Sequence, residues 1–269
     1  MKRAVSGLLV AAAAAIALGF LILPMLAIFL RVPPGRLLHL LTTSIVTDAL
    51  VVSFKTTAIA QVLILVFGTP LAWLIASRRF RGRGLAITLV ELPLVLPPAV
   101  AGLGLLAAFG RTGLLKTGIP FTQTAVVLAV AFVSSPLYIR AAVAAFEGVD
   151  PNLVAASRTL GAGPGRTFFR VVLPLARTGL AAGEALASAR GLGEFGATIM
   201  FAGSLQQVTQ TLPLAIYAEF DRNFDATLAM SGVLVLFSVV LLLGLRIGMT
   251  WHRSPSKRSL YLFGPSVSG

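Results

Sequence analysis

Five of the ionisable side chains inside long apolar stretches of this 269-residue chain could pair with one another, and a charge there is costly unless it has a partner or water. They are Glu91, Arg140, Glu184, Arg190 and Glu194. Arg190 and Glu194 are four residues apart, so one helix would place them on the same face as a pair. Glu91 and Arg140 lie at a similar depth in two other stretches, about 9 Å from one end at ~1.5 Å per residue, with Glu184 near that level. The pattern predicts ion pairs between and along apolar helices.

Residue types that perform catalysis or bind metals are scarce. The chain has no cysteine and only two histidines, His39 and His252, which are too few for a zinc site. A phosphate-binding loop needs Gly-Lys followed by Ser or Thr, and no lysine here follows a glycine. Gly191 to Gly196 matches the dinucleotide-binding pattern in letters, but it lies in an apolar stretch without the strand that this site requires. We therefore expect no catalytic residue, metal site or cofactor in this chain.

The composition identifies an all-α membrane protein. Hydrophobic residues make up 57% of the chain and charged residues 12%, with a mean hydropathy of +0.93, which excludes an ordinary soluble domain and a disordered chain. A spanning helix needs about 20 apolar residues, and six stretches qualify. They are 8–30, 49–76, 85–109, 124–146, 179–203 and 226–249. The first resembles a signal peptide, but its apolar run is too long for one, so we predict a retained helix in a single membrane domain, 1–269.

The distribution of Lys and Arg predicts that both termini lie in the cytoplasm. With the N-terminus inside, fourteen of the 22 basic residues face the cytoplasm: Lys2, Arg3, Arg78, Arg79, Arg81, Arg83, Arg158, Arg166, Arg170, Arg177, Arg246, Arg253, Lys257 and Arg258. Five face outward: Arg31, Arg36, Arg111, Lys116 and Arg222. The longest cytoplasmic segment is then 147–178, between the fourth and fifth spans.

This segment has strong helix boundary signals. Asp150-Pro151 starts a helix, with Asp as the N-cap and Pro at the first position, and Gly161 to Pro164 end it. A second short helix is predicted from Gly165 to about Val172, before Leu173-Pro174. Leu153, Ala156 and Leu160 form one apolar stripe on the first helix. That stripe suits either a membrane-surface helix or a helix that docks into a groove of another protein.

The same segment resembles the signature loop of ABC importer permeases, E-A-A-x-x-x-G, nine residues, I-x-L-P. Ala156, Gly161, Leu173 and Pro174 match, and Val171 replaces Ile. The Glu of the family is missing, with Val154 and Ala155 at or beside its place. The resemblance implies a coupling helix that docks onto a cytoplasmic ATPase. The residues to which it assigns that role are Asn152, Leu153, Ala155, Ala156, Ser157, Arg158, Thr159, Leu160, Gly161, Ala162 and Gly163.

Further runs resemble the molybdate/tungstate branch of these permeases. They are FGTPLAWLIASRRFRGRG (67–84), ELPLVLPPAVAGLGLLAAFGRTGLL (91–115), GLGEFGATIMFAG (191–203) and TQTLPLAIY (209–217). The resemblance implies a homodimer in the cell membrane with two ATPase subunits, which bind ATP and Mg, and an external oxyanion-binding protein.

Sulfate or thiosulfate permeases are the close alternative to a molybdate/tungstate permease. A secondary transporter, a channel and an intramembrane enzyme fit less well, because each acid in the spans has a plausible basic neighbour and no nucleophile–base pair is present.

Ser134, Ser135 and Thr198 are candidate lining residues of the transport pathway, although each hydroxyl could equally bond a carbonyl of its own helix. Arg190 could attract an oxyanion, but structural pairing is the favoured interpretation. Prolines 93, 97, 98 and 136 predict bent helices. Gly179 and Gly183 form a GxxxG pattern, which predicts close helix packing.

Overall fold

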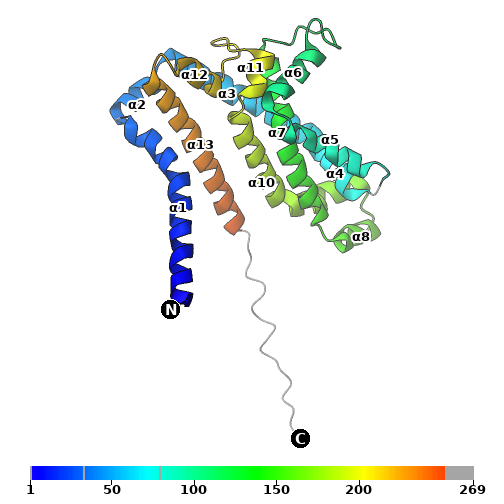
Figure 1. Ribbon diagram of the computed structural model, residues 1–269. Helices are drawn as coiled ribbons and strands as arrows, with labels where there is room; N and C mark the ends of the chain where they lie inside the picture. The colour runs from blue at the N-terminus through cyan, green and yellow to red at the C-terminus, as the bar shows by residue number, and fades with distance from the viewer. Residues whose placement is uncertain (1, 33, 79, 252–269) are drawn as a thin grey trace.

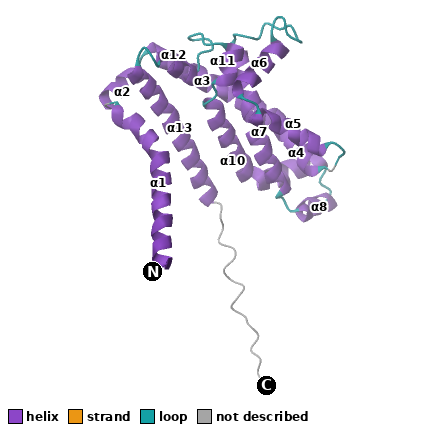
Figure 2. Cartoon of the chain, in the orientation of Figure 1, coloured by secondary structure: helices purple, strands orange, loops and turns teal. Residues whose placement is uncertain are grey.

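A computed structural model describes residues 2–32, 34–78 and 80–251 of the chain. All regular structure in these ranges is helical (Figure 2), which agrees with the predicted fold class. Five residues that have a role in the sequence-based predictions are Arg79, His252, Arg253, Lys257 and Arg258. They lie outside the described residues.

The N-terminal part consists of two long helical segments. Helix α1 (Lys2–Arg31) is followed by the short α2 (Pro34–Leu41). Helix α3 (Ser44–Leu63) then continues through a π-helical turn (Ile64–Gly68) into α4 (Thr69–Ser77). These segments correspond to the first two predicted spans.

The third predicted span is sharply bent. Helix α5 (Arg83–Val95) and α6 (Pro98–Phe109) meet at an angle of 114°. Leu96 and Pro97 each precede a proline and adopt extended backbone angles, because the proline ring disfavours the helical conformation of the residue before it. The predicted break at Pro97 and Pro98 is therefore present, whereas Pro93 lies inside α5.

The C-terminal half contains the remaining elements. Helix α7 (Gln123–Glu147) matches the fourth predicted span and is followed by α8 (Pro151–Thr159). Next come α9 (Pro164–Thr167), a π-helical turn (Phe168–Val172), α10 (Leu173–Leu192) and α11 (Gly196–Ala202). Helices α12 (Leu212–Glu219) and α13 (Phe224–Trp251) complete the fold, with α13 beside α1 and α12 in Figure 1.

The segment around α10 differs from the prediction in two respects. The helix that starts at Pro164 does not end before Leu173-Pro174 but continues through the π-helical turn into α10. The span predicted at 179–203 is instead a helix that ends at Leu192 and a separate helix that begins at Gly196.

Both π-helical turns in the described chain immediately precede a residue–proline pair, Thr69-Pro70 and Leu173-Pro174. A wider turn moves the preceding carbonyl away from the proline ring, so the helix continues through the proline.

Helices α7 and α10 form the most extensive helix pair of the core. A Cβ atom added at Gly179 would lie 2.6 Å from Cβ of Ala145, and one added at Gly183 would lie 2.6 Å from Cβ of Ala141. Both distances are far below normal van der Waals contact. The two glycines therefore allow the backbones to approach closely, as the GxxxG pattern predicts.

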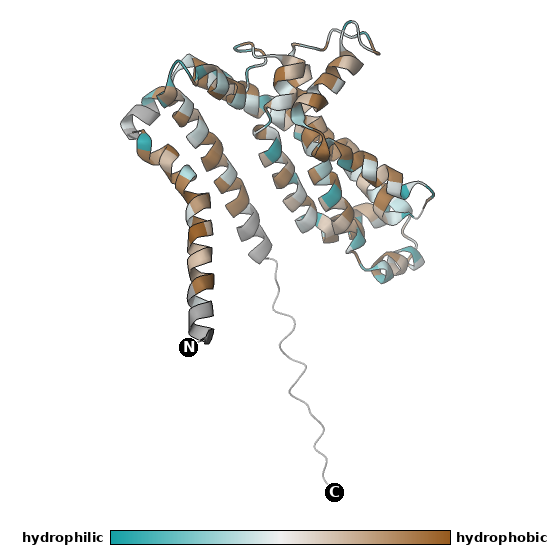
Figure 3. Cartoon of the chain, viewed as in Figure 1, coloured by the Kyte–Doolittle hydropathy of each residue, from teal (hydrophilic) through white to brown (hydrophobic). Residues whose placement is uncertain are grey.

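Four stretches within the described residues are long and apolar enough to cross a membrane: Leu9–Arg31, Ser44–Ser77, Gln123–Glu147 and Phe224–Gly244. The bent pair α5–α6 makes a fifth if it counts as one span. Helix α10 carries Arg177, Glu184 and Arg190 and is not in this set, so six spans are not established. Large apolar side chains of α1 and α13 remain exposed. Figure 3 shows the hydrophobic residues of these helices in brown. These faces are suited to lipid or to other subunits.

Candidate functional site

Helix α8 has the boundaries predicted for the coupling helix. The carboxylate of Asp150 accepts a hydrogen bond from the backbone N–H of Asn152 at 2.8 Å, and Pro151 occupies the first turn. The helix ends at Thr159, and Gly161 adopts a φ of +83°, a left-handed conformation that favours glycine. The short helix is thus specified by its own local sequence.

The apolar stripe of α8 faces away from the rest of the chain. Leu153 is 47% exposed, Leu160 is 88% exposed, and Ala156 between them is also exposed. Val154 and Ser157 are half-buried, and Ser157 Oγ lies 3.0 Å from Thr167 Oγ1 of α9. In Figure 1, α8 lies at the end of the molecule opposite the loops that flank α11 and α12. A helix held by one face with its apolar stripe exposed is suited to contact another protein.

Replacing Asp150 with alanine should loosen α8 without unfolding the chain. Loss of an N-cap carboxylate costs a helix about 1 kcal/mol, which corresponds to an approximately fivefold increase in local opening. Hydrogen–deuterium exchange of the amides in 151–159 measures this change. Asp221→Ala, an exposed aspartate of a turn, is the matched control. Unchanged exchange in Asp150→Ala would contradict the capping role.

Arg190 and Glu194 form the predicted ion pair, with Nη1 of Arg190 2.7 Å from Oε2 of Glu194. The pair does not lie along one continuous helix, because α10 ends at Leu192. Glu194 is 2% exposed, and its Oε1 accepts a hydrogen bond from the backbone N–H of Ala197 at 2.7 Å in the first turn of α11. This carboxylate therefore joins the end of α10 to the start of α11, which favours a structural role for the pair.

Glu91 and Arg140 also pair, with Nε of Arg140 3.1 Å from Oε1 of Glu91, and they link α5 to α7.

Glu184 was predicted to have a basic neighbour, but its carboxyl group has a different environment. Among the described residues, its hydrogen-bond donor is the hydroxyl of Ser188 at 3.3 Å, and its Oε2 is buried without a hydrogen-bond partner. The carboxyl group of Glu184 instead faces a hollow.

This hollow has a volume of about 930 Å³ and is bounded by α4, α7, α9 and α10. Its wall is mostly apolar and includes two hydroxyl groups that sequence reasoning missed, Thr69 Oγ1 and Tyr138 Oη, which lie 2.6 Å apart. Thr69 and Tyr138 are far apart in sequence, so no sequence signal brings them together with Glu184. Hydroxyl groups beside a carboxyl group form a polar spot in an otherwise apolar cavity.

The predicted pathway residues do not form one cluster. The hydroxyl groups of Ser134 and Ser135 donate to backbone carbonyls of their own helix, at 2.6 Å to Val130 and 3.5 Å to Phe132. This is the alternative to a pathway role that the sequence left open. Thr198 is fully buried, and its hydroxyl has no hydrogen-bond partner within the described ranges. Sequence reasoning also missed Gln61 of α3, whose buried amide has no hydrogen-bond partner in the part of the chain that the structure describes. The sequence signal that could have identified Gln61 is its polar amide side chain inside the apolar stretch 49–76.

Comparison with protein families identifies the chain. The family model described as binding-protein-dependent transport system inner membrane component matches residues 68–252. The chain belongs to this family. It is therefore a multi-pass membrane permease, and the matched region includes α8 together with the helices α4, α7, α9 and α10 that bound the hollow.

Close relatives of this permease carry the name of one transport system. The molybdenum transport system permease protein ModB of Mycobacterium tuberculosis is 44% identical over 234 residues, which cover 84% of this chain and 88% of the relative. ModB of Escherichia coli K12 is 43% identical over 63% of this chain and 78% of the relative. A probable molybdenum ABC transporter permease of Haloferax volcanii is 38% identical over 82% of this chain and 84% of the relative.

Solved structures show that the permease has the fold of ABC transporter membrane chains. A chain of the inward-facing MetNI methionine ABC transporter matches with a TM-score of 0.61 at 18% identity, covering 82% of this chain and all of the other. A chain of a bacterial ABC transporter that imports alginate matches with a TM-score of 0.65 at 15% identity, covering 94% and 98%. At these identities the likeness concerns the fold alone.

Proposed function

We propose that this permease carries molybdate, or the closely similar tungstate, across the cell membrane as part of an ATP-driven importer. The observation that carries the proposal is the 44% identity with a molybdenum permease over most of both chains. Molybdate is a tetrahedral dianion, and sulfate has the same shape and charge. A sulfate or thiosulfate permease is therefore the alternative that substrate measurements must exclude.

The proposed assembly contains two copies of this chain, two ATPase subunits and an external oxyanion-binding protein. No lysine of this chain follows a glycine as a phosphate-binding loop requires, so ATP and Mg bind to the ATPase subunits. The exposed stripe of α8 supports docking of each ATPase onto this helix. ATP binding then draws the two halves together, α8 transmits the movement, and the pathway alternates between inward-facing and outward-facing states.

The proposed topology keeps six spans with both termini in the cytoplasm. Helix α10 supplies the remaining span, supported by its twenty residues and its close packing against α7. Glu184 and Arg190 then lie within the membrane, where Arg190 pairs with Glu194. The start of α1 and helix α8 lie toward the same end of the molecule in Figure 1, which supports a cytoplasmic N-terminus.

The function is tested by reconstituting the purified complex in proteoliposomes with the binding protein on the outside. We expect uptake of labelled molybdate that requires both ATP and the binding protein, with little uptake of labelled sulfate. Sulfate uptake without molybdate uptake would move the assignment to the alternative. Uptake that does not require ATP would overturn the ABC mechanism.

Leu160→Asp should separate the ATPase from the permease, because a carboxylate cannot enter the apolar contact expected of the α8 stripe. The measurement is retention of the ATPase during affinity purification of the permease. Leu114→Asp is the matched control, since Leu114 is equally exposed, at 87% against 88% for Leu160, and lies in the loop after α6. Equal retention in both variants would contradict docking through α8.

A further inference from the structure

A second hollow lies where α4, α5, α7 and α8 meet, and its charge differs from that of the first. Its volume is about 720 Å³, and three arginines line it, Arg78, Arg83 and Arg158, against one glutamate, Glu147. We call this hollow the basic cleft. Three positive charges beside one negative charge leave an excess of two positive charges in a cavity that opens to the surface.

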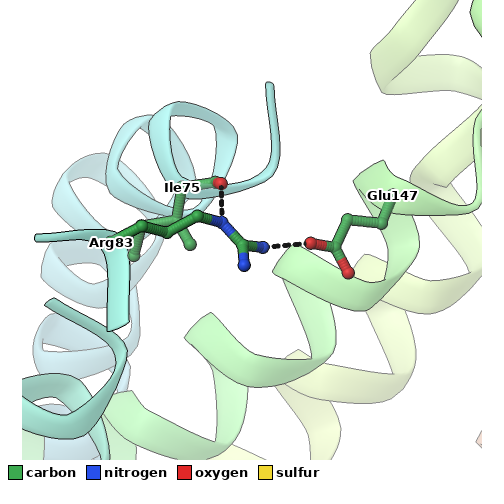
Figure 4. Close-up of polar contacts among 3 residues, drawn as sticks. All are labelled: Ile75, Arg83 and Glu147. Carbon is green, nitrogen blue, oxygen red and sulfur yellow. Dashed lines mark hydrogen bonds and ion pairs between the residues drawn. The ribbon is translucent and has the colours of Figure 1, made fainter. Parts of the chain in front are cut away.

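One of the three arginines is already used within the chain. Nε of Arg83 donates to the carbonyl of Ile75 at 2.9 Å, and its guanidinium forms an ion pair with Glu147 (Figure 4). These contacts join the start of α5 to the ends of α4 and α7. The pair forms a fixed wall of the cleft, and it neutralises the single carboxylate that the cleft contains.

The other two arginines are not neutralised by any carboxylate that lines the cleft. Arg78 and Arg158 are exposed, and among the described residues neither forms an ion pair. Behind them the cleft has an aromatic floor, where the rings of Trp73 and Phe146 meet edge to face at 5.4 Å between centroids. Because Arg78 and Arg158 are exposed at the edge of the cleft, their guanidinium groups are available to a partner.

We propose that the basic cleft binds acidic side chains of the ATPase subunit, which makes it a second contact beside the apolar stripe of α8. This inference rests on the proposed function. Arg158 and Val154 of α8 form one wall of the cleft, so a protein that covers α8 also reaches the cleft. Two exposed guanidinium groups match one or two carboxylates in charge and geometry.

The charged residues of α8 also favour a partner surface that is negatively charged. Its acidic residue is the N-cap Asp150, whose carboxylate is bound to the backbone of Asn152. Ala155 stands at or beside the position of the glutamate in the signature motif. The contact surface of this permease therefore offers positive charge, and the complementary surface of the ATPase must offer negative charge.

A phospholipid headgroup is a competing occupant, because phosphate also binds arginine pairs. Position favours the ATPase. Helix α8 lies beyond the ends of α4 and α7 in Figure 1, and the cleft wall that carries Arg158 belongs to this projecting helix. A partner that approaches α8 from the cytoplasm thus meets Arg158 directly.

The test is retention of the ATPase on the tagged permease in the complete purified complex, washed with increasing concentrations of NaCl. The double variant Arg78→Gln/Arg158→Gln should release the ATPase at lower salt than the wild type, with binding weakened about tenfold or more, as for other close charge pairs. Arg111→Gln/Arg222→Gln is the matched control, since both arginines are exposed and lie outside the cleft, in the loops that follow α6 and α12. Arg78→Lys/Arg158→Lys, which keeps the charges, should retain the ATPase more strongly than the Gln variant.

Size-exclusion chromatography of each variant establishes that the permease remains folded, and the bound phospholipid is counted in the same samples. Retention in the Gln variant equal to that of the wild type would overturn the inference. Equal retention with loss of bound phospholipid would assign the cleft to a headgroup instead. If the wild-type permease retained no ATPase at all, the proposed function itself would fail, which is a result distinct from either of these.

Discussion

Arg190→Gln is expected to destabilise the permease by about 3–5 kcal/mol, because it leaves the buried carboxylate of Glu194 without its counter-charge. Glu194 also caps the first turn of α11 through the N–H of Ala197, so the unpaired charge disturbs the junction between α10 and α11. The measurement is thermal unfolding of the detergent-purified protein, followed by the fraction that remains monodisperse. Molybdate uptake should fall in parallel with the amount of folded protein.

Arg140→Gln is the matched control for this substitution. It removes the same charge from a pair whose side chains are 60% and 38% exposed, so the loss of stability should be smaller. Arg190→Gln/Glu194→Gln should recover part of the stability, because it removes the unpaired charge as well. If Arg190→Gln unfolds like the wild type and yet abolishes uptake, Arg190 belongs to the transport pathway rather than to the structure.

Gly183→Leu should severely disrupt the packing of α7 against α10. A Cβ at Gly183 already comes within 2.6 Å of Ala141, and the backbone oxygen of Tyr138 is 3.3 Å away, so no rotamer of leucine relieves the overlap. Overpacking of this kind costs about 1–3 kcal/mol and often more where backbones touch. We expect loss of the folded permease in detergent, measured by size-exclusion chromatography and by the unfolding temperature.

Gly104→Leu is the control, since Gly104 also lies in a helix but a Cβ there meets nothing within 4 Å. Its unfolding temperature should stay close to that of the wild type. Equal stability of the two leucine variants would show that the contact between α7 and α10 is looser than the structure describes.

Features that depend on neighbouring residues in the sequence were predicted accurately. Asp150, Pro151 and Gly161 act through their own backbone or that of the next turn, so the two ends of α8 followed from local chemistry. The spacing of Gly179 and Gly183 likewise indicated a close helix contact. These signals lie within one or two helical turns.

Features that depend on distant segments were not predictable in the same way. The break between Leu192 and Gly196 was missed because an unbroken apolar stretch predicts one helix, whereas the carboxylate of Glu194 stabilises a new helix start. The continuation of the helix through Leu173-Pro174 was missed because a π-helical turn leaves no sequence mark. Packing of separate helices brings together Thr69 and Tyr138.

The composition of α10 has a consequence for biosynthesis. On the proposed topology, Glu184 and Arg190 must both enter the bilayer on a helix that is less apolar than the other spans. Each charge near the centre of a helix opposes insertion by about 2.5–3.5 kcal/mol. We therefore expect that α10 does not insert alone but leaves the translocon together with α7, which is synthesised first and offers the groove for Gly179 and Gly183. The glycines that pack the mature core would thus also determine whether the nascent chain acquires this span.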